Sequence, residues 1–274
     1  SSDNQENTKV WKFSGNTGLN MSQTSLTNWS AGGDNSIAGN MFFNGELDYK
    51  KNNWLWQNSL ILEYGLLRNK GEGMRKTTDK IDFSTQLGYS TNDTWYYTVM
   101  GDFKSQFYKG YNYPNKTNYI SKFMAPAYAN FSIGMEYKPA DKFYSVYLSP
   151  LSTKMTFVQD DSLSNAGAFG VDPGDKFRIE LGSYIKAKAE RNIMENVNLK
   201  TDLTLFTAYD SSFGNIDVEW NVYLNMKINK YLNASINTSL KYDDDVKYIN
   251  SEGVAEGPRV QFKEVLGIGI LYKF

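Results

Sequence analysis

The sequence contains no cysteine and no histidine among its 274 residues. Without cysteine there is no disulfide framework and no thiolate chemistry. Without histidine, the commonest general base and the commonest metal ligand are both missing. The composition therefore argues against most enzyme mechanisms, and we expect no cofactor and no metal.

Long hydrophobic runs are also missing. The mean hydropathy is −0.53, and no apolar run reaches the roughly 18 residues of a transmembrane helix. A membrane barrel is not excluded, because in each of its strands only alternate residues meet lipid. The net charge of −1 argues against electrostatic binding of nucleic acid, so no nucleic-acid partner is expected.

Strict alternation of apolar and polar residues is present instead. At the C-terminus, Leu266, Ile268, Ile270, Tyr272 and Phe274 are apolar at a spacing of two. A spacing of two is typical of a strand with one apolar face. A last strand that ends on an aromatic residue looks like the closing strand of an outer-membrane barrel, in which apolar residues face lipid and polar residues face the lumen.

The alternation predicts strands along nearly the whole chain. We expect them near 10–26, 36–49, 54–67, 79–90, 94–108, 126–138, 142–157, 176–190, 196–209, 215–229, 231–243 and 260–274. Short turns alternate with longer loops at 27–35, 68–78, 109–125, 158–175, 210–214 and 244–259. This pattern predicts an all-β, antiparallel, up-and-down transmembrane barrel of twelve strands, with short periplasmic turns and longer extracellular loops.

Closure of the barrel and one irregularity are also predicted. A membrane sheet must satisfy every backbone polar group, so the first strand should pair with the last. Near Pro150 the apolar positions switch from even (Leu148) to odd (Leu151) numbers. Proline lacks the ladder donor, so a β-bulge is expected there.

Aromatic residues make up 15% of the chain, which is high. Many of them are predicted to face outward beside the short turns, where amphipathic rings would lie at the membrane–water interface. The predicted periplasmic aromatic girdle consists of Trp54, Trp56, Trp95, Tyr97, Tyr137, Tyr144, Tyr272 and Phe274. A general preference of aromatics for strands is the alternative explanation, but it does not predict this clustering.

The most distinctive segment of the chain contains Asn28-Trp29-Ser-Ala-Gly32-Gly33. It resembles a motif of a Bacteroidota outer-membrane β-barrel family catalogued as a domain of unknown function, and the C-terminal Phe274 fits the same family. The resemblance implies a barrel in the outer membrane of a Gram-negative bacterium and supplies no activity. Physically, the two glycines suit a tight connection, and a contact with a ligand or partner is the alternative role.

The same alternation predicts which charged side chains face the lumen. One wall is acidic and contains Glu46, Asp48, Glu63, Asp82, Asp102 and Glu136. The facing wall is mainly basic and contains Lys154, Arg178, Lys186, Lys188 and Lys200. Either water fills the lumen between the walls, or opposed side chains pair across it, because twelve strands lie between filled and open barrels.

If water fills the lumen, the protein is predicted to be a narrow porin-like channel for small hydrophilic solutes. If side chains pair across the lumen, it is predicted to be a non-conducting structural or accessory subunit of a larger outer-membrane complex. An enzyme is not expected, because outer-membrane phospholipases and omptin proteases both depend on histidine. The run Asp243-Asp244-Asp245 could contribute to Ca²⁺ binding, but its spacing does not match an EF-hand and a solvated acidic loop is the favoured interpretation.

The expected organisation is simple. Residues 1–9 form a flexible periplasmic N-terminus, and residues 10–274 form the barrel, with both termini periplasmic. The polar start Ser1–Asn7 is interpreted as a mature end left by signal-peptide removal, although an arbitrary chain boundary explains it equally well. Outer-membrane lipid and lipopolysaccharide are the expected surroundings, and other outer-membrane proteins are candidate partners.

Overall fold

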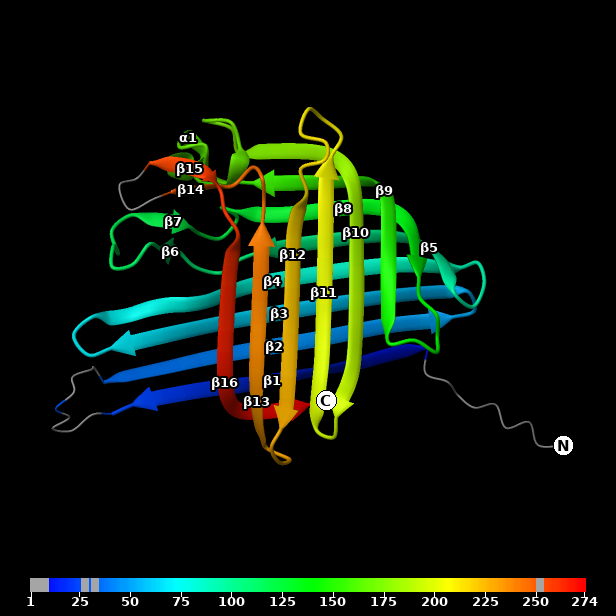
Figure 1. The fold of residues 1–274 in the computed structure, drawn as a ribbon, viewed down its shortest axis with the longest axis horizontal. Helices are drawn as coiled ribbons and strands as arrows, with labels where there is room; N and C mark the ends of the chain where they lie inside the picture. The colour runs from blue at the N-terminus through cyan, green and yellow to red at the C-terminus, as the bar shows by residue number, and fades with distance from the viewer. Residues whose placement is uncertain (1–9, 26–29, 31–34, 250–253) are drawn as a thin grey trace.

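Twelve long strands close into one antiparallel barrel in the computed structural model, which describes residues 10–25, 30, 35–249 and 254–274 (Figure 1). The first six are β1 (Trp11–Thr24), β2 (Ser36–Lys51), β3 (Trp54–Asn69), β4 (Gly73–Ser90), β5 (Trp95–Ser105) and β8 (Ala127–Tyr137). The second six are β9 (Tyr144–Phe157), β10 (Phe177–Met194), β11 (Val197–Ala208), β12 (Asp217–Lys227), β13 (Leu232–Tyr242) and β16 (Gln261–Lys273). The predicted twelve-stranded fold is confirmed.

Each barrel strand pairs with its neighbour in sequence, and β1 pairs with β16. The remaining elements lie within the longer connections and gather at one end of the barrel, on the left and top of Figure 1. They are β6 (Gly110–Tyr111), β7 (Tyr119–Ser121), α1 (Asp161–Asn165), the 3₁₀ helix η1 (Ala168–Gly170), β14 (Lys247–Ile249) and β15 (Ala255–Pro258). We call this the long-loop end and the opposite end the short-turn end. Within the described ranges, no helix is long and apolar enough to cross a membrane.

One predicted long loop is wrong. Residues 68–78 form the tip of a hairpin, because β3 continues to Asn69 and β4 begins at Gly73. Gly71 and Gly73 both adopt positive φ, at 85° and 75°, which a tight turn of this kind requires. The strand ends at this tip could not be located from the sequence, because apolar and polar residues no longer alternate there.

The outer surface of the barrel is apolar. Leu266, Ile268 and Ile270 on β16 are 69%, 57% and 60% exposed, and large apolar side chains cover the outer faces of the other strands in the same way. Two indole N–H groups on this face are paired with hydroxyl groups: that of Trp56 donates to Thr85 at 2.8 Å, and that of Trp220 to Thr201 at 2.9 Å. Such a continuous apolar surface fits lipid and not water.

The predicted β-bulge at Pro150 is confirmed. Gly182 and Tyr184 of β10 pair with Ser152 and Ser149 of β9, so Pro150 and Leu151 together oppose one residue of β10. The freed carbonyl of Pro150 accepts a hydrogen bond from the Tyr209 hydroxyl at 2.6 Å. The bulge therefore shifts the apolar parity of β9 without leaving this carbonyl unsatisfied.

The seam between β1 and β16 closes the barrel, as predicted, but it is short. Its register runs only from Asn16–Lys273 to Asn20–Gly269, and Gly15 and Phe274 exchange backbone hydrogen bonds of 3.1 Å beside it. On its other side, β16 stays paired with β13 as far as Gln261. The family-motif residues Asn28, Trp29, Gly32 and Gly33 follow β1 and lie outside the described residues.

Candidate functional site in the barrel lumen

Hydrogen bonds and ion pairs cross the lumen between strands far apart in the wall. The ammonium group of Lys104 on β5 lies 2.9 Å from the Glu219 carboxylate on β12, although β8, β9, β10 and β11 separate these strands. Lys80 on β4 donates to the hydroxyl of Tyr223 on β12 at 3.4 Å, with five strands between them in either direction. These contacts bridge the full width of the lumen.

The residues of the predicted acidic wall each lie on the inward face, and several of their partners lie on the same strand or on one close by in the wall. Glu63 accepts from Asn40 at 2.7 Å, Glu136 accepts from Gln86, and Asp82 lies 3.6 Å from Lys80. Two residues of this wall pair with the predicted basic wall: Glu46 with Lys200 at 3.3 Å and Asp102 with Lys186 at 3.5 Å. Asp48 lies beside Gln57 in the register of β2 and β3.

The other residues of the predicted basic wall have partners outside the acidic wall. Lys154 lies 2.7 Å from both Asp217 and Asp243. Arg178 lies 3.2 Å from Glu180 and 3.0 Å from Asp245. Among the described residues, Lys188 makes no ion pair, and its side chain is exposed within the lumen. The predicted acidic and basic walls are thus joined by ion pairs in some places and not in others.

An apolar cluster also fills part of the lumen, and the sequence analysis did not predict it. It consists of Met100, Tyr147, Tyr184, Phe206 and Ala208, all nearly inaccessible to solvent. The rings of Tyr147 and Tyr184 meet edge to face at 6.1 Å. These residues occupy inward positions of β5, β9, β10 and β11, where alternation alone predicts polar side chains. Apolar residues at inward positions were the signal in the sequence from which this cluster could have been predicted.

At the long-loop end, the connection between β9 and β10 packs against the connection between β5 and β8, and we call these two packed loops the cover. Val158, Leu163 and Val171 of the β9–β10 connection pack with Ala125 into a second buried cluster. Asp160 caps α1, because its carboxylate accepts from the Leu163 amide at 2.9 Å. The same carboxylate accepts from the Tyr119 hydroxyl at 2.8 Å and lies 2.5 Å from the Lys122 ammonium. One side chain therefore ties two long loops together.

These contacts make the cover sensitive to acid. Burial alone would raise the pKa of Asp160, but hydrogen bonds from Lys122, the Leu163 amide and Tyr119 outweigh it and lower the pKa to about 2. A carboxyl group with a lowered pKa stabilises the folded form above its unfolded pKa, and this stability is lost as the pH falls through the folded pKa. We therefore expect pepsin to cleave within residues 159–176 at pH about 2 but not at pH about 4.

Two variants control this measurement. Asp160→Asn should be cleaved already at the higher pH, because it loses the charge that holds Lys122. Asp161→Asn should behave as the parent protein, since the Asp161 side chain is 83% exposed and pairs only with Lys176 at the surface. Equal protection of the parent protein at both pH values would contradict the role of Asp160.

The acidic run Asp243-Asp244-Asp245 does not converge on a common point. Asp243 pairs with Lys154, Asp244 accepts from Asn215 at 2.7 Å, and Asp245 pairs with Arg178. Three different partners leave no shared space for Ca²⁺. In the part of the chain that the structure describes, no group of three or more Asp or Glu side chains is placed to hold a metal ion.

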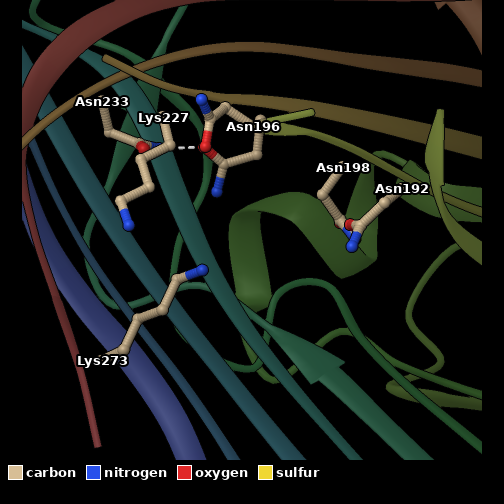
Figure 2. Close-up of a pocket in the computed structure, with 7 residues that line it drawn as sticks. Asn192, Asn196, Asn198, Lys227, Asn233 and Lys273 are labelled. Atoms are coloured by element: carbon tan, nitrogen blue, oxygen red, sulfur yellow. Dashed lines mark hydrogen bonds between the residues drawn. The ribbon is translucent and has the colours of Figure 1, made fainter. Parts of the chain in front are cut away.

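At the short-turn end, the lumen contains a polar cavity of about 210 Å³ (Figure 2). It is lined by Asn192, Asn196, Asn198, Asn225, Lys227, Asn233 and Lys273. Asn198, Asn225, Lys227, Asn233 and Lys273 hold inward positions by period-two alternation, but the lumen residues predicted from the sequence do not include them. The recurrence of Asn at inward positions beside the short turns was the missed signal.

The predicted girdle residues lie around the short-turn end, on the outer surface. Ring pairs link several of them: Trp54 contacts Tyr89 at 5.0 Å, Trp95 contacts Tyr137 at 5.1 Å, Tyr137 contacts Tyr144 at 6.3 Å, and Tyr272 contacts Phe274 at 6.2 Å. Trp56 contacts Trp11 at 5.8 Å, and Tyr97 is 60% exposed. Exposed rings gathered beside the short turns are the arrangement expected at a membrane interface.

The chain resembles a known family over its first barrel strands. Residues 21–111 match the family described as "Protein of unknown function (DUF3078)". This match confirms the predicted resemblance to a family of unknown function, and it includes the segment with Asn28 and Trp29. No curated protein matches the sequence.

Several solved structures of outer-membrane proteins are distantly similar. The translocator domain of the autotransporter NalP from Neisseria meningitidis has 10% identity and a TM-score of 0.41, covering 98% of this chain and 90% of its own. The NanC porin has 9% identity and a TM-score of 0.39, covering 94% and 99%. OmpT, an outer-membrane protein of Vibrio cholerae, has 9% identity and a TM-score of 0.33, covering 96% and 97%. Likeness at this level assigns no function.

Proposed function

We propose that the protein is an outer-membrane barrel whose lumen is closed, and that it serves as a structural or accessory subunit and not as an open porin. The contact between Lys80 and Tyr223 carries this proposal, because it joins opposite walls of the barrel. The Lys104–Glu219 pair is a second bridge between distant strands. Together the two bridges obstruct the passage of a hydrated solute while they remain paired.

The long-loop end and the interior of the lumen support the same proposal. The packed loops around Asp160 lie at the long-loop end, and the Met100–Tyr147–Tyr184–Phe206–Ala208 cluster fills one side of the interior. By analogy with other outer-membrane barrels, we propose that the long-loop end is extracellular and that the short turns and both termini are periplasmic. We propose no catalytic role.

Planar-bilayer recording of the purified protein tests the closed lumen. We expect no reproducible single-channel steps, because the cross-lumen pairs leave no open path. Slower migration in SDS gels after boiling, compared with the unboiled sample, provides the control that the recorded protein is a folded barrel. Reproducible steps from the folded protein would contradict the proposal.

A narrow porin-like channel is the second candidate, and one observation favours it. Lys188 is exposed in the lumen and unpaired among the described residues, as expected of a side chain that faces water. If conductance steps are recorded, the double variant Lys186→Glu with Lys188→Glu should shift selectivity from anions towards cations. Unchanged selectivity would show that the current does not pass these residues.

A further inference from the structure

The polar cavity at the short-turn end has a chemistry unlike the rest of the lumen. Several lysines elsewhere in the lumen pair with carboxylates: Lys104 with Glu219, Lys186 with Asp102, and Lys200 with Glu46. The cavity contains two lysines and no carboxylate among its lining residues. It is therefore a positively charged recess.

Neither cavity lysine has an anionic partner. Within the described ranges, the ammonium groups of Lys227 and Lys273 take part in no ion pair and no hydrogen bond, although both side chains line the same cavity (Figure 2). They come from the ends of β12 and β16, which lie on either side of β13. Both lysines are exposed, so each ammonium group is free to meet an anion that enters the cavity.

Asparagine amides complete the lining. Asn192, Asn198 and Asn225 are successive register partners across β10, β11 and β12. Asn198 donates to Asn192 at 3.0 Å, and Asn233 donates to Asn225. Each of these bonds uses one N–H and one oxygen, so every amide keeps further donor or acceptor capacity. The wall can therefore offer several directed N–H donors beside the two charges.

We infer that this cavity binds a phosphate monoester. Such a group carries about −1.5 to −2 charges at neutral pH and three strong acceptor oxygens. Two lysines supply the matching charge, and lysine is a common phosphate ligand in proteins. The volume of about 210 Å³ is several times the space of one water molecule, about 30 Å³, so the phosphate and a short polar chain fit together. Asparagines then donate to the remaining oxygens.

The inference goes beyond the proposed function and does not depend on it, because a closed barrel and a channel can both hold such a ligand. Free organic phosphates and phospholipid head groups carry the same chemical group. The cavity lies at the short-turn end of the barrel, and ligands from either source are candidates. Glycerol 3-phosphate and phosphatidic acid are therefore the probes for the two sources.

Isothermal titration of the detergent-solubilised barrel with glycerol 3-phosphate tests the site. We expect saturable binding, with glycerol giving no heat because it lacks the charged group. Lys227→Gln and Lys273→Gln should each weaken binding about tenfold, the usual effect of losing one charge-assisted hydrogen bond. Asn225→Asp should weaken it at least as much, since it places a carboxylate beside the phosphate.

Lys51→Gln is the matched control, because Lys51 lies at the same end of the barrel, on β2, and does not line the cavity. It should bind as the parent protein does. Retention of phosphatidic acid in nanodiscs that depends on Lys227 and Lys273, without binding of glycerol 3-phosphate, would support the same site with a lipid as its ligand. Absence of both, or binding indifferent to the two lysines in variants that still show heat-modifiable migration, would overturn the inference.

Discussion

Replacing Ile185 by arginine is expected to destabilise the barrel by about 2–4 kcal/mol, the cost of a cation on the lipid face near the bilayer midplane. In a water-soluble protein the same change would be nearly neutral, because Ile185 is 40% exposed and surface substitutions are usually within about 0.5 kcal/mol. The large effect depends on lipid as the surrounding medium. The substitution therefore tests the membrane location directly.

The depth of Ile185 follows from the β9–β10 hairpin. At its long-loop end, Phe157 and Phe177 meet at 5.1 Å between ring centres. At its short-turn end, the girdle residue Tyr144 pairs in register with Ala189. Ile185 lies between these aromatic levels, where its register partner on β9 is Leu148. Aromatic rings mark the two interfaces, so Ile185 lies in the hydrocarbon region.

Guanidinium unfolding of the protein in lipid vesicles measures the effect, and Ala189→Arg is its matched control. Ala189 faces outward on the same strand but lies at the level of Tyr144, so arginine there should cost about 0–1 kcal/mol. Equal free energies of unfolding for the two variants would show that the outer face does not sense membrane depth. That result would argue against the bilayer as its surroundings.

Glu219→Gln is expected to lower the free energy of unfolding by about 3 kcal/mol, because it leaves the Lys104 ammonium without its anion inside the lumen. The side chains of Lys104 and Glu219 are 27% and 20% exposed, so the expected cost lies at the low end of the range for buried pairs. Lys104→Met should lower the free energy of unfolding by a similar amount, since it leaves the Glu219 carboxylate without its cation.

A double-mutant cycle separates the pair from its surroundings. Lys104→Met with Glu219→Leu should recover most of the loss, because both charges of the bridge are removed together. Lys241 also loses its partner Glu219, but at 3.9 Å and 52% exposure this second pair contributes little. The exposed pair Lys142–Asp141 in a short turn provides the control, with side chains 48% and 75% exposed. Lys142→Met should change stability by less than about 0.5 kcal/mol. Additive effects at positions 104 and 219 would mean that the two groups do not interact across the lumen.

Much of the fold follows from period-two alternation. Because lipid replaces a protein core, every membrane strand must show one apolar face, and all twelve barrel strands could be located from it. The parity change at Pro150 even predicted the bulge between Ser149 and Ser152. Alternation fails where strands leave the membrane, which is why the start of β4 at Gly73 was missed.

The lumen was predictable only in part. Parity placed Glu46, Asp102, Lys186 and Lys200 on the inward face, and these residues form two pairs between the predicted walls. The parity of a residue does not tell where it lies along the barrel axis or whether its side chain reaches across the lumen. The Lys104–Glu219 bridge, the Asp160 cover and the asparagine-lined cavity all depend on strand tilt and loop packing, which bring together residues far apart in sequence.

The short seam between β1 and β16 gives the cylinder one direction of easy deformation. Past Asn20 and Gly269, the described residues of the two strands form no backbone ladder, so this part of the wall is held together only by the short paired segment at its end. Spreading it breaks no backbone hydrogen bond, whereas spreading any other pair of strands breaks a long row of them. Changes in the circumference of the barrel would thus be concentrated at this line, with the paired segment near Phe274 as the hinge.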